Sequence, residues 1–163
     1  MDIRKIFEYA LSREFEGKKF FEDNASRLNN AVAVSAFKNL ALEEQKHIEF
    51  IQIQLKALDE GHPSILSAGQ KLEQAGFFSQ RAASEMIDQT VVEAMVPDLP
   101  VLRIAYLIER DFAEFYEMAS QKTEGEAKEV LFMLATWERG HERLFKFLHD
   151  KAFEEYAQMP WGG

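Results

Sequence analysis

The sequence lacks cysteine altogether in its 163 residues. Without thiols, the chain forms no disulfide, no Cys-ligated zinc site and no iron–sulfur cluster, and it has no thiol nucleophile. It also lacks an apolar run approaching the roughly 18–20 residues that cross a bilayer, and no signal-peptide core follows Met1. We therefore expect a cytoplasmic protein whose redox chemistry, if it has any, does not use sulfur.

Basic residues are scarce relative to acidic ones. The chain has 19 lysines and arginines against 28 aspartates and glutamates, which gives a formal net charge of −9. Nucleic acids and anionic membranes select basic surfaces, so neither is expected as a partner. The excess of acid is instead compatible with the binding of cations.

Helix-breaking residues are few, with four prolines and eight glycines, most of them clustered. Between the clusters lie four long segments in which apolar residues recur every three or four positions, the spacing of an amphipathic helix. These stripes run from Ile3 to Leu28, from Phe37 to Leu58, from Leu102 to Ala119 and from Leu131 to Ala152. Strand-type alternation is nowhere sustained, so the sequence predicts a single all-α domain over residues 1–163.

The links between the predicted helices differ in length. Short links near Asn29 and Thr123 predict two antiparallel hairpins, and the second link begins with a capping-box pattern at Thr123. The segment between the hairpins, about residues 60–98, is long enough for a crossover along the side of a bundle, with a further helix expected over 77–95. Two hairpins joined by a long, partly helical crossover are the connectivity of a ferritin-like four-helix bundle.

Each apolar stripe is interrupted near its middle by a glutamate where a core residue would otherwise stand. Two of these glutamates are followed three residues later by a histidine. The residues are Glu14, Glu44 with His47, Glu109, and Glu138 with His141. Glu14 precedes Glu44 by 30 residues and Glu109 precedes Glu138 by 29, which indicates an internal duplication of a helical hairpin.

Four carboxylates directed into one core point to a metal site. Burying an unpaired carboxylate costs several kcal/mol unless it is protonated or meets a cation. Two divalent ions would balance the four charges, and two neutral imidazoles would complete the ligands. Because positions i and i+3 share a helix face, each Glu-x-x-His can bind one ion, with Glu14 and Glu109 bridging or capping from the other helices. This is the ligand set of di-iron carboxylate bundles, and it suits iron or manganese better than zinc.

The surroundings of these residues also repeat between the halves. Residues 14–21 (EFEGKKFF) align with residues 109–116 (ERDFAEFY), and residues 42–47 (LEEQKH) align with residues 136–141 (TWERGH). A glutamate followed by a small residue and a Phe-Phe or Phe-Tyr pair, upstream of Glu-x-x-His, resembles the rubrerythrin-related branch of the ferritin-like superfamily over nearly the whole chain. The di-iron ligands that the resemblance implies are Glu14, Glu44, His47, Glu109, Glu138 and His141.

The resemblance further implies an activity and partners. It implies a di-iron oxidoreductase that oxidises Fe²⁺ with dioxygen or hydrogen peroxide, as a ferroxidase or a peroxide scavenger. Ferritin-like relatives also commonly assemble, so a homodimer or larger homo-oligomer is expected.

Three departures from that family bear on function. Rubrerythrins carry a Cys-ligated, rubredoxin-like iron module, which this sequence lacks, so an external electron donor or Fe²⁺ itself must supply electrons. Phe112 occupies the position of an extra rubrerythrin glutamate, so the family's redox-linked ligand exchange does not carry over directly. The first aromatic pair is Phe20-Phe21, which leaves Tyr116 as the phenol able to hydrogen-bond a ligand carboxylate.

Two other functions are compatible with the sequence. The chain could bind iron for storage or delivery with little turnover, or it could be a helical adaptor whose buried carboxylates are hydrogen-bonded without metal. Asp59 and His62 also have ligand spacing, but they fall at a helix end and are not expected to form a site. The acidic residues beside the implied ligands are expected on a solvated face rather than along an Fe²⁺ entry path. These are Glu16, Glu43 and Glu114.

Overall fold

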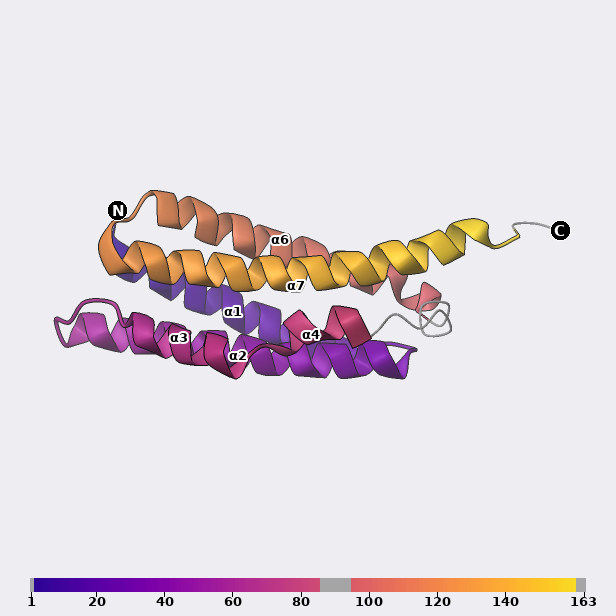
Figure 1. The fold of residues 1–163 in the computed structure, drawn as a ribbon, viewed down its shortest axis with the longest axis horizontal. Helices are drawn as coiled ribbons and strands as arrows, with labels where there is room; N and C mark the ends of the chain where they lie inside the picture. Colours follow the sequence, from indigo (N-terminus) through magenta and orange to yellow (C-terminus); the bar gives the residue numbers. More distant parts are fainter. Residues whose placement is uncertain (1, 86–94, 161–163) are drawn as a thin grey trace.

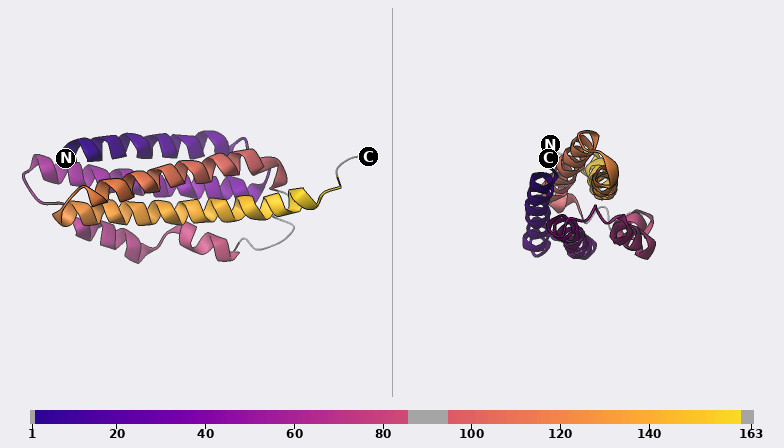
Figure 2. Two further views of the ribbon diagram at one scale, coloured as in Figure 1. Left: turned by 90° about the horizontal axis from the view of Figure 1, so that it is seen from above. Right: turned by 90° about the vertical axis from the view of Figure 1, so that its left-hand side faces the viewer.

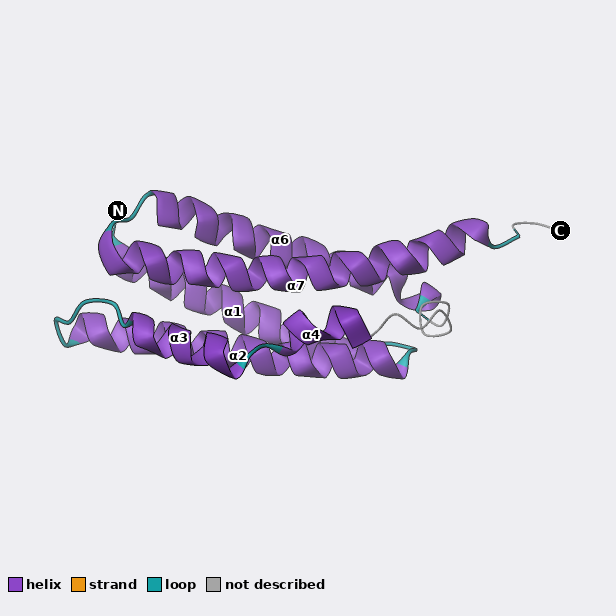
Figure 3. Cartoon of the chain, in the orientation of Figure 1, coloured by secondary structure: helices purple, strands orange, loops and turns teal. Residues whose placement is uncertain are grey.

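The computed structural model describes residues 2–85 and 95–160, which fold as helices joined by short connections (Figure 1). Among these residues no strand is present, as Figure 3 shows, and the predicted all-α fold class is confirmed. The helices of the described residues are α1 (Ile3–Ala25), α2 (Ala31–Asp59), α3 (Leu66–Ala75), α4 (Phe78–Glu85), the 3-10 helix η1 (Val96–Asp98), α6 (Leu99–Gln121) and α7 (Gly125–Gln158).

Four long helices form the bundle. α1 and α2 pack as one antiparallel hairpin, and α6 and α7 pack as the other (Figure 2). The connections within the hairpins are short, residues 26–30 and 122–124. α3 and α4 run between the hairpins and contact both α2 and α7, so the crossover covers one side of the bundle. This connectivity confirms the ferritin-like arrangement of two hairpins and a partly helical crossover.

The crossover contains one helix, α3, that the sequence analysis does not predict. α3 is only ten residues long, too short to produce a clear apolar stripe. A side chain at Gly69 would meet Phe50 of α2 and Met133 of α7 at 2.9 Å, so glycine permits the close approach of α3 to both helices. Of the helix expected over 77–95, α4 covers the first part, and residues 86–94 lie outside the described residues.

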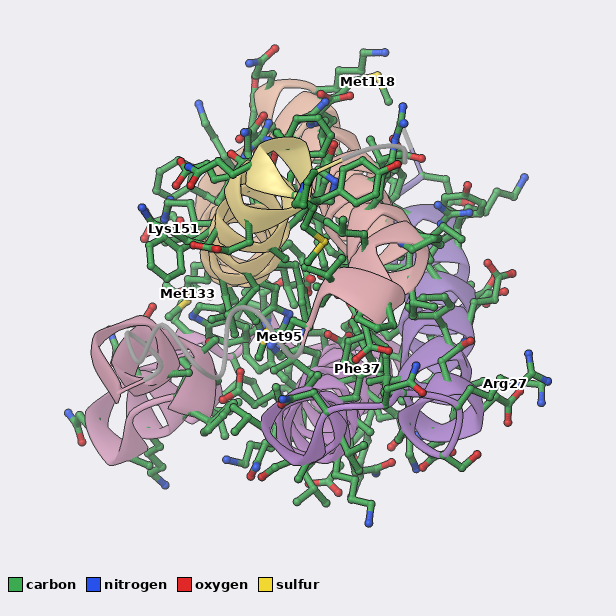
Figure 4. All side chains as sticks on the ribbon, turned by 90° about the vertical axis from the view of Figure 1, so that its right-hand side faces the viewer. Arg27, Phe37, Met95, Met118, Met133 and Lys151 are labelled. Carbon is green, nitrogen blue, oxygen red and sulfur yellow. The ribbon has the colours of Figure 1, made fainter. Side chains whose placement is uncertain are left out.

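Apolar side chains form two clusters along the bundle. The first surrounds Phe21, Phe37 and Phe145 and includes Met95; Figure 4 shows Phe37 and Met95 inside the bundle. Members of the second cluster include Phe7, Phe50, Ile51, Tyr116 and Leu131. Ionisable residues interrupt the long helices between the clusters. In the described ranges, no helix is both long enough and apolar enough to cross a membrane.

Asp98 joins the end of the crossover to the first hairpin. Its buried carboxylate accepts hydrogen bonds from the backbone N–H groups of Asn29 (2.9 Å) and Asn30 (3.2 Å) and from the Asn29 side-chain amide (3.0 Å). The Asn30 side chain in turn accepts from the N–H groups of Val32 and Ala33 and caps α2. Asp98 does not cap its own helix, α6. It fixes the start of α2 to the start of α6.

The capping box expected at Thr123 does not form. The Thr123 hydroxyl donates to the carbonyl oxygens of Ala119 (3.1 Å) and Ser120 (3.3 Å), and so it satisfies the end of α6 instead. α7 begins at Gly125, whose φ of +65° lies in the left-handed region that glycine adopts without strain.

Replacement of Asp98 by alanine should destabilise the metal-free protein by about 2–3 kcal/mol, because two backbone N–H groups near the bundle end lose their acceptor. The measurement is urea unfolding monitored by circular dichroism. Asp111→Ala, which removes an exposed aspartate from α6, is the matched control and should change the free energy of unfolding by less than about 0.5 kcal/mol. Equal effects of the two substitutions would contradict the role given to Asp98.

Candidate metal centre

Each long helix carries one glutamate into the space between the two apolar clusters. Glu14, for example, lies seven residues from Phe7 of one cluster and seven from Phe21 of the other, so the apolar stripe of α1 directs its carboxylate inward. The four glutamates, all with 0% exposure, are Glu14 on α1, Glu44 on α2, Glu109 on α6 and Glu138 on α7. His47 and His141, one turn after two of these glutamates, are exposed by at most 1%.

The six residues form two overlapping ligand sets, in each of which the ligand atoms lie within 4.8 Å of one another. The His47 set consists of Glu14, Glu44, His47 and Glu138. The His141 set consists of Glu44, Glu109, Glu138 and His141. Glu44 and Glu138 belong to both sets, whereas Glu14 and Glu109 each belong to one. Of the two roles expected for Glu14 and Glu109, bridging or capping, membership of a single set each favours capping. Sequence spacing gives the helix face of a residue but not which side chains meet at the centre.

Both imidazoles direct Nδ1 toward the carboxylates. Nδ1 of His47 lies 2.7 Å from Glu138, and Nδ1 of His141 lies 3.0 Å from Glu44 and 3.3 Å from Glu109. The two rings are nearly parallel, with an interplanar angle of 9° and centroids 5.2 Å apart. The two sets therefore face each other as neighbouring positions.

Several buried oxygen atoms of the cluster have no hydrogen-bond partner. They are both carboxylate oxygens of Glu44, both of Glu138 and Oε1 of Glu109. The 2.7 Å approach between Glu138 Oε1 and His47 Nδ1 lies outside hydrogen-bond geometry. A buried polar atom without a partner costs about 1–3 kcal/mol, and more when it is charged. Carboxylate oxygens and imidazole nitrogens that converge in this way fit two divalent metal ions.

Without metal, protons occupy part of the centre. Burial raises the pKa of Glu14 well above its ordinary 4.5, and the charges of Glu138 and Glu44 raise it further. Burial and the charge of Glu44 have the same effect on the pKa of Glu109. These two carboxyl groups therefore remain protonated at pH values where an exposed glutamate is ionised.

The two histidines and the two shared glutamates, in contrast, are charged. Burial lowers the pKa of His47, but Glu138 and Glu44 outweigh it and hold this pKa well above 6.5. The surrounding carboxylates outweigh burial in the same way at His141. Burial also opposes ionisation of Glu138, yet the charge on His47 holds the pKa of Glu138 well below 4.5, and the pKa of Glu44 is lowered as well. Within these six residues, two imidazolium ions thus balance two carboxylates.

Tyr116 contacts only one of the two outer glutamates. Its hydroxyl donates a hydrogen bond to Glu14 Oε1. Burial and the charge of Glu14 raise the pKa of Tyr116 well above 10, so the phenol keeps its proton. The duplicated position is Phe21, which has no hydroxyl, and Oε1 of Glu109 has no partner.

Glu43 is a buried part of the centre, and the expectation of a solvated position is wrong for it. Its exposure is 2%, and its Oε2 lies 2.9 Å from Nε2 of His141. Ser79, at the start of α4, donates from its hydroxyl (2.9 Å) and its backbone N–H (3.2 Å) to the Glu43 carboxylate. A signal for this burial exists in the sequence, because Glu43 continues the stripe of buried residues Leu40, His47, Phe50 and Gln54 on α2. The other acidic and histidine candidates outside the centre, Glu16, Asp59, His62 and Glu114, are exposed.

The corresponding neighbour of His47 is aromatic. Trp137, which precedes Glu138 as Glu43 precedes Glu44, stacks on His47 with ring centroids 5.2 Å apart. Its indole N–H donates to Glu73 of α3 at 3.2 Å. Nε2 of His47 is buried without a hydrogen-bond partner. The two histidines therefore differ in what their outer nitrogens meet.

Phe112, which stands in place of an extra glutamate, packs beside Gly17 near the centre. Its side chain is 2% exposed, and it packs so closely on Gly17 that a Cβ atom there would lie 2.9 Å from the ring. The same Cβ would lie 3.6 Å from Glu44 Oε2. Gly17 and Phe112 hold duplicated positions, so the glycine makes room for the ring beside the centre.

The chain matches the model of a known protein family. The family model described as rubrerythrin matches residues 5–149. Comparisons with curated proteins and with solved structures give no match. The matched segment includes all four glutamates and both histidines of the two ligand sets, and its helical hairpins carry the buried cluster described above. The chain therefore belongs to the rubrerythrin family.

Proposed function

We propose that this protein is a di-iron oxidoreductase, which binds two Fe²⁺ ions in the His47 and His141 sets and reacts them with dioxygen or hydrogen peroxide. The observation that carries the proposal is the pair of overlapping ligand sets, whose buried oxygens on Glu44, Glu109 and Glu138 have no partner. Mixed carboxylate and imidazole donors favour iron or manganese over zinc. Membership of the rubrerythrin family favours iron.

The His47 and His141 sets would hold two Fe²⁺ ions, which would supply two electrons; with two protons, these suffice to reduce one molecule of hydrogen peroxide to two molecules of water. The residues of the chain position the ligands and keep the centre dry. Tyr116 holds its proton on the hydrogen bond to Glu14 and so orients that carboxylate. The apolar clusters on both sides exclude bulk water, which strengthens the electrostatic hold of the carboxylates on a cation.

A small pocket beside the histidines supports access of a small oxidant. Its volume is about 160 Å³, and Ser79 and Trp137 contribute to its lining. Trp137 stacks on His47, and Ser79 binds Glu43, which contacts His141. One or two side chains therefore separate the pocket from each imidazole. Since a water molecule occupies about 30 Å³ in the liquid, the pocket has room for dioxygen or hydrogen peroxide.

The source of electrons distinguishes this function from a second candidate, iron storage or delivery with little turnover. The chain has no cysteine with which to ligate a rubredoxin-like iron centre, and Phe112 provides no carboxylate for ligand exchange. Repeated turnover therefore requires an external electron donor. Without such a donor, Fe²⁺ itself is the reductant and each centre is oxidised once.

Anaerobic addition of Fe²⁺ or Mn²⁺ should load two ions per chain. Alanine substitutions of the four glutamates should show which of them bind one ion and which bind both. Glu14→Ala and Glu109→Ala should each leave about one ion bound, whereas Glu44→Ala and Glu138→Ala should lose both, because their carboxylates belong to both sets. The measurement is metal content after equilibrium dialysis. Glu16→Ala, at an exposed position two residues from Glu14, should still bind two ions. Fewer than about one ion in the unmodified protein would contradict both iron functions.

Binding of two divalent ions near pH 7 should release up to about four protons, because the ions replace two carboxyl protons and two imidazolium protons. Calorimetry in buffers of different ionisation enthalpy measures this number. Release of less than about one proton would contradict the proposed exchange.

The metal-free protein should lose stability as the pH rises above about 6.5. The raised pKa values of Glu14, Glu109, His47 and His141 mean that the folded state binds more protons than the unfolded state in this range. The carboxyl groups with lowered pKa values are ionised in both states there and add no slope. Urea unfolding with chelator present measures the effect, and a stability that rises with pH would contradict the assigned protonation.

Turnover is tested by mixing the Fe²⁺-loaded protein with an excess of hydrogen peroxide or dioxygen and following the absorption of the ferric product. A reduced dye or a reduced rubredoxin then supplies electrons. An oxidoreductase should consume oxidant over many cycles, at a rate that depends on the donor. Oxidation that stops at one event per centre in the presence of every donor would favour storage over the proposed function.

A further inference from the structure

The two histidines face the carboxylates through the same nitrogen but differ at the other. Nε2 of His141 lies 2.9 Å from the Glu43 carboxylate, whereas Nε2 of His47 is buried and has no hydrogen-bond partner. Trp137 and Phe77 lie against the His47 ring instead, with centroid distances of 5.2 and 6.1 Å. The duplication therefore supplies a charged partner to one imidazole and an apolar surface to the other.

The Glu43 carboxylate is itself held in place. It is 2% exposed, and two hydrogen bonds from Ser79 fix it at the start of α4. A carboxylate that accepts the Nε2–H of an imidazole fixes the tautomer with a free lone pair on Nδ1, and it makes that nitrogen a stronger donor to a metal. Nδ1 of His141 is the nitrogen that faces Glu44 and Glu109.

The two outer carboxyl groups, Glu14 and Glu109, also differ, and their difference likewise favours metal binding at the His141 set. Tyr116 donates a hydrogen bond to Glu14 of the His47 set, which draws electron density away from that carboxylate and weakens it as a metal ligand. Oε1 of Glu109, in the His141 set, has no such partner. The His141 set thus combines a strengthened imidazole with an outer carboxyl group to which no phenol donates, and the His47 set has neither.

We propose that Glu43 is a positioning residue that makes the two metal positions unequal, so that the His141 set fills before the His47 set. The crossover provides this asymmetry, because Ser79 of α4 orients Glu43 while Trp137, bonded to Glu73 of α3, covers His47. The inference rests on the proposed binding of two metal ions. It assigns to the crossover a role in setting the order of loading.

Anaerobic titration with Co²⁺, followed by calorimetry and visible absorption, tests the order of loading. The unmodified protein should bind two ions in separate steps at least about tenfold apart in affinity. Glu109→Ala should remove the tighter step and Glu14→Ala the weaker one. Glu43→Gln should weaken the tighter step by about 10- to 100-fold and leave the weaker step unchanged.

A spectroscopic readout separates positioning from general loss of structure. In the Co²⁺ protein, the hyperfine-shifted Nε2–H proton of His141 should exchange slowly with solvent, and Glu43→Gln should shift it and speed its exchange. Ser79→Ala, which keeps the carboxylate and the backbone N–H hydrogen bond to it, should weaken the same step by up to about fivefold and remains informative if Glu43→Gln does not fold. Glu49→Gln, at an exposed position on α2, is the matched control and should leave both steps unchanged.

The outcomes distinguish this inference from the proposed function. Absence of Co²⁺ binding to the unmodified protein would overturn the di-metal function itself. Two ions of equal affinity, or equal weakening of both steps by Glu43→Gln, would overturn only the role of Glu43. The role of Glu43 would also be overturned if Glu43→Gln left both steps and the Nε2–H signal unchanged. If that variant does not fold, the same result with Ser79→Ala would overturn it.

Discussion

Four carboxyl groups and two imidazoles, buried together between two apolar clusters, are the constraint on which the rest of the bundle depends. Isolated carboxylates could not remain ionised there, because burial of each costs several kcal/mol. The charges of the histidines and the shared glutamates Glu44 and Glu138 balance, while Glu14 and Glu109 retain protons. Two divalent cations can replace the two carboxyl protons and the two imidazolium protons without changing the net charge, so the same arrangement is compatible with folding and with metal binding.

Duplication of the hairpin explains the geometry, and departures from the duplication explain its chemistry. The backbone repeats closely enough to bring two Glu-x-x-His motifs face to face, with rings 5.2 Å apart. Around them the two halves differ at three pairs of positions, each of which touches the centre. The pairs are Gly17 and Phe112, Phe21 and Tyr116, and Glu43 and Trp137. The first pair differs in size, the second in a hydroxyl group, and the third in charge. The two halves of the centre therefore cannot be equivalent.

Much of this architecture follows from the sequence because its causes are periodic. The positions of the long helices, the short hairpin links and the inward direction of Glu14, Glu44, Glu109 and Glu138 depend on spacing along single helices. The sequence does not reveal that Glu44 and Glu138 belong to both ligand sets, because this depends on how four helices pack.

The polar side chains whose partners the sequence does not predict have one feature in common: those partners lie on other elements. The stripe of α2 indicates that Glu43 is buried, but not what it meets, because its partners, Ser79 and His141, lie 36 and 98 residues away in the chain. Thr123 has the local sequence of a helix start, yet its hydroxyl bonds to the end of the preceding helix. Asp98 immediately precedes α6, yet its carboxylate bonds to the start of α2. Short polar side chains near helix ends can satisfy several neighbouring backbone groups, and tertiary contacts decide which.

Anomalous X-ray diffraction at the iron edge, from crystals of the protein loaded anaerobically with Fe²⁺, tests the central claim most directly. The account predicts two peaks per chain, one beside Nδ1 of His47 and one beside Nδ1 of His141, with Glu44 and Glu138 reaching both. A single peak, or no peak among these six residues, would contradict it.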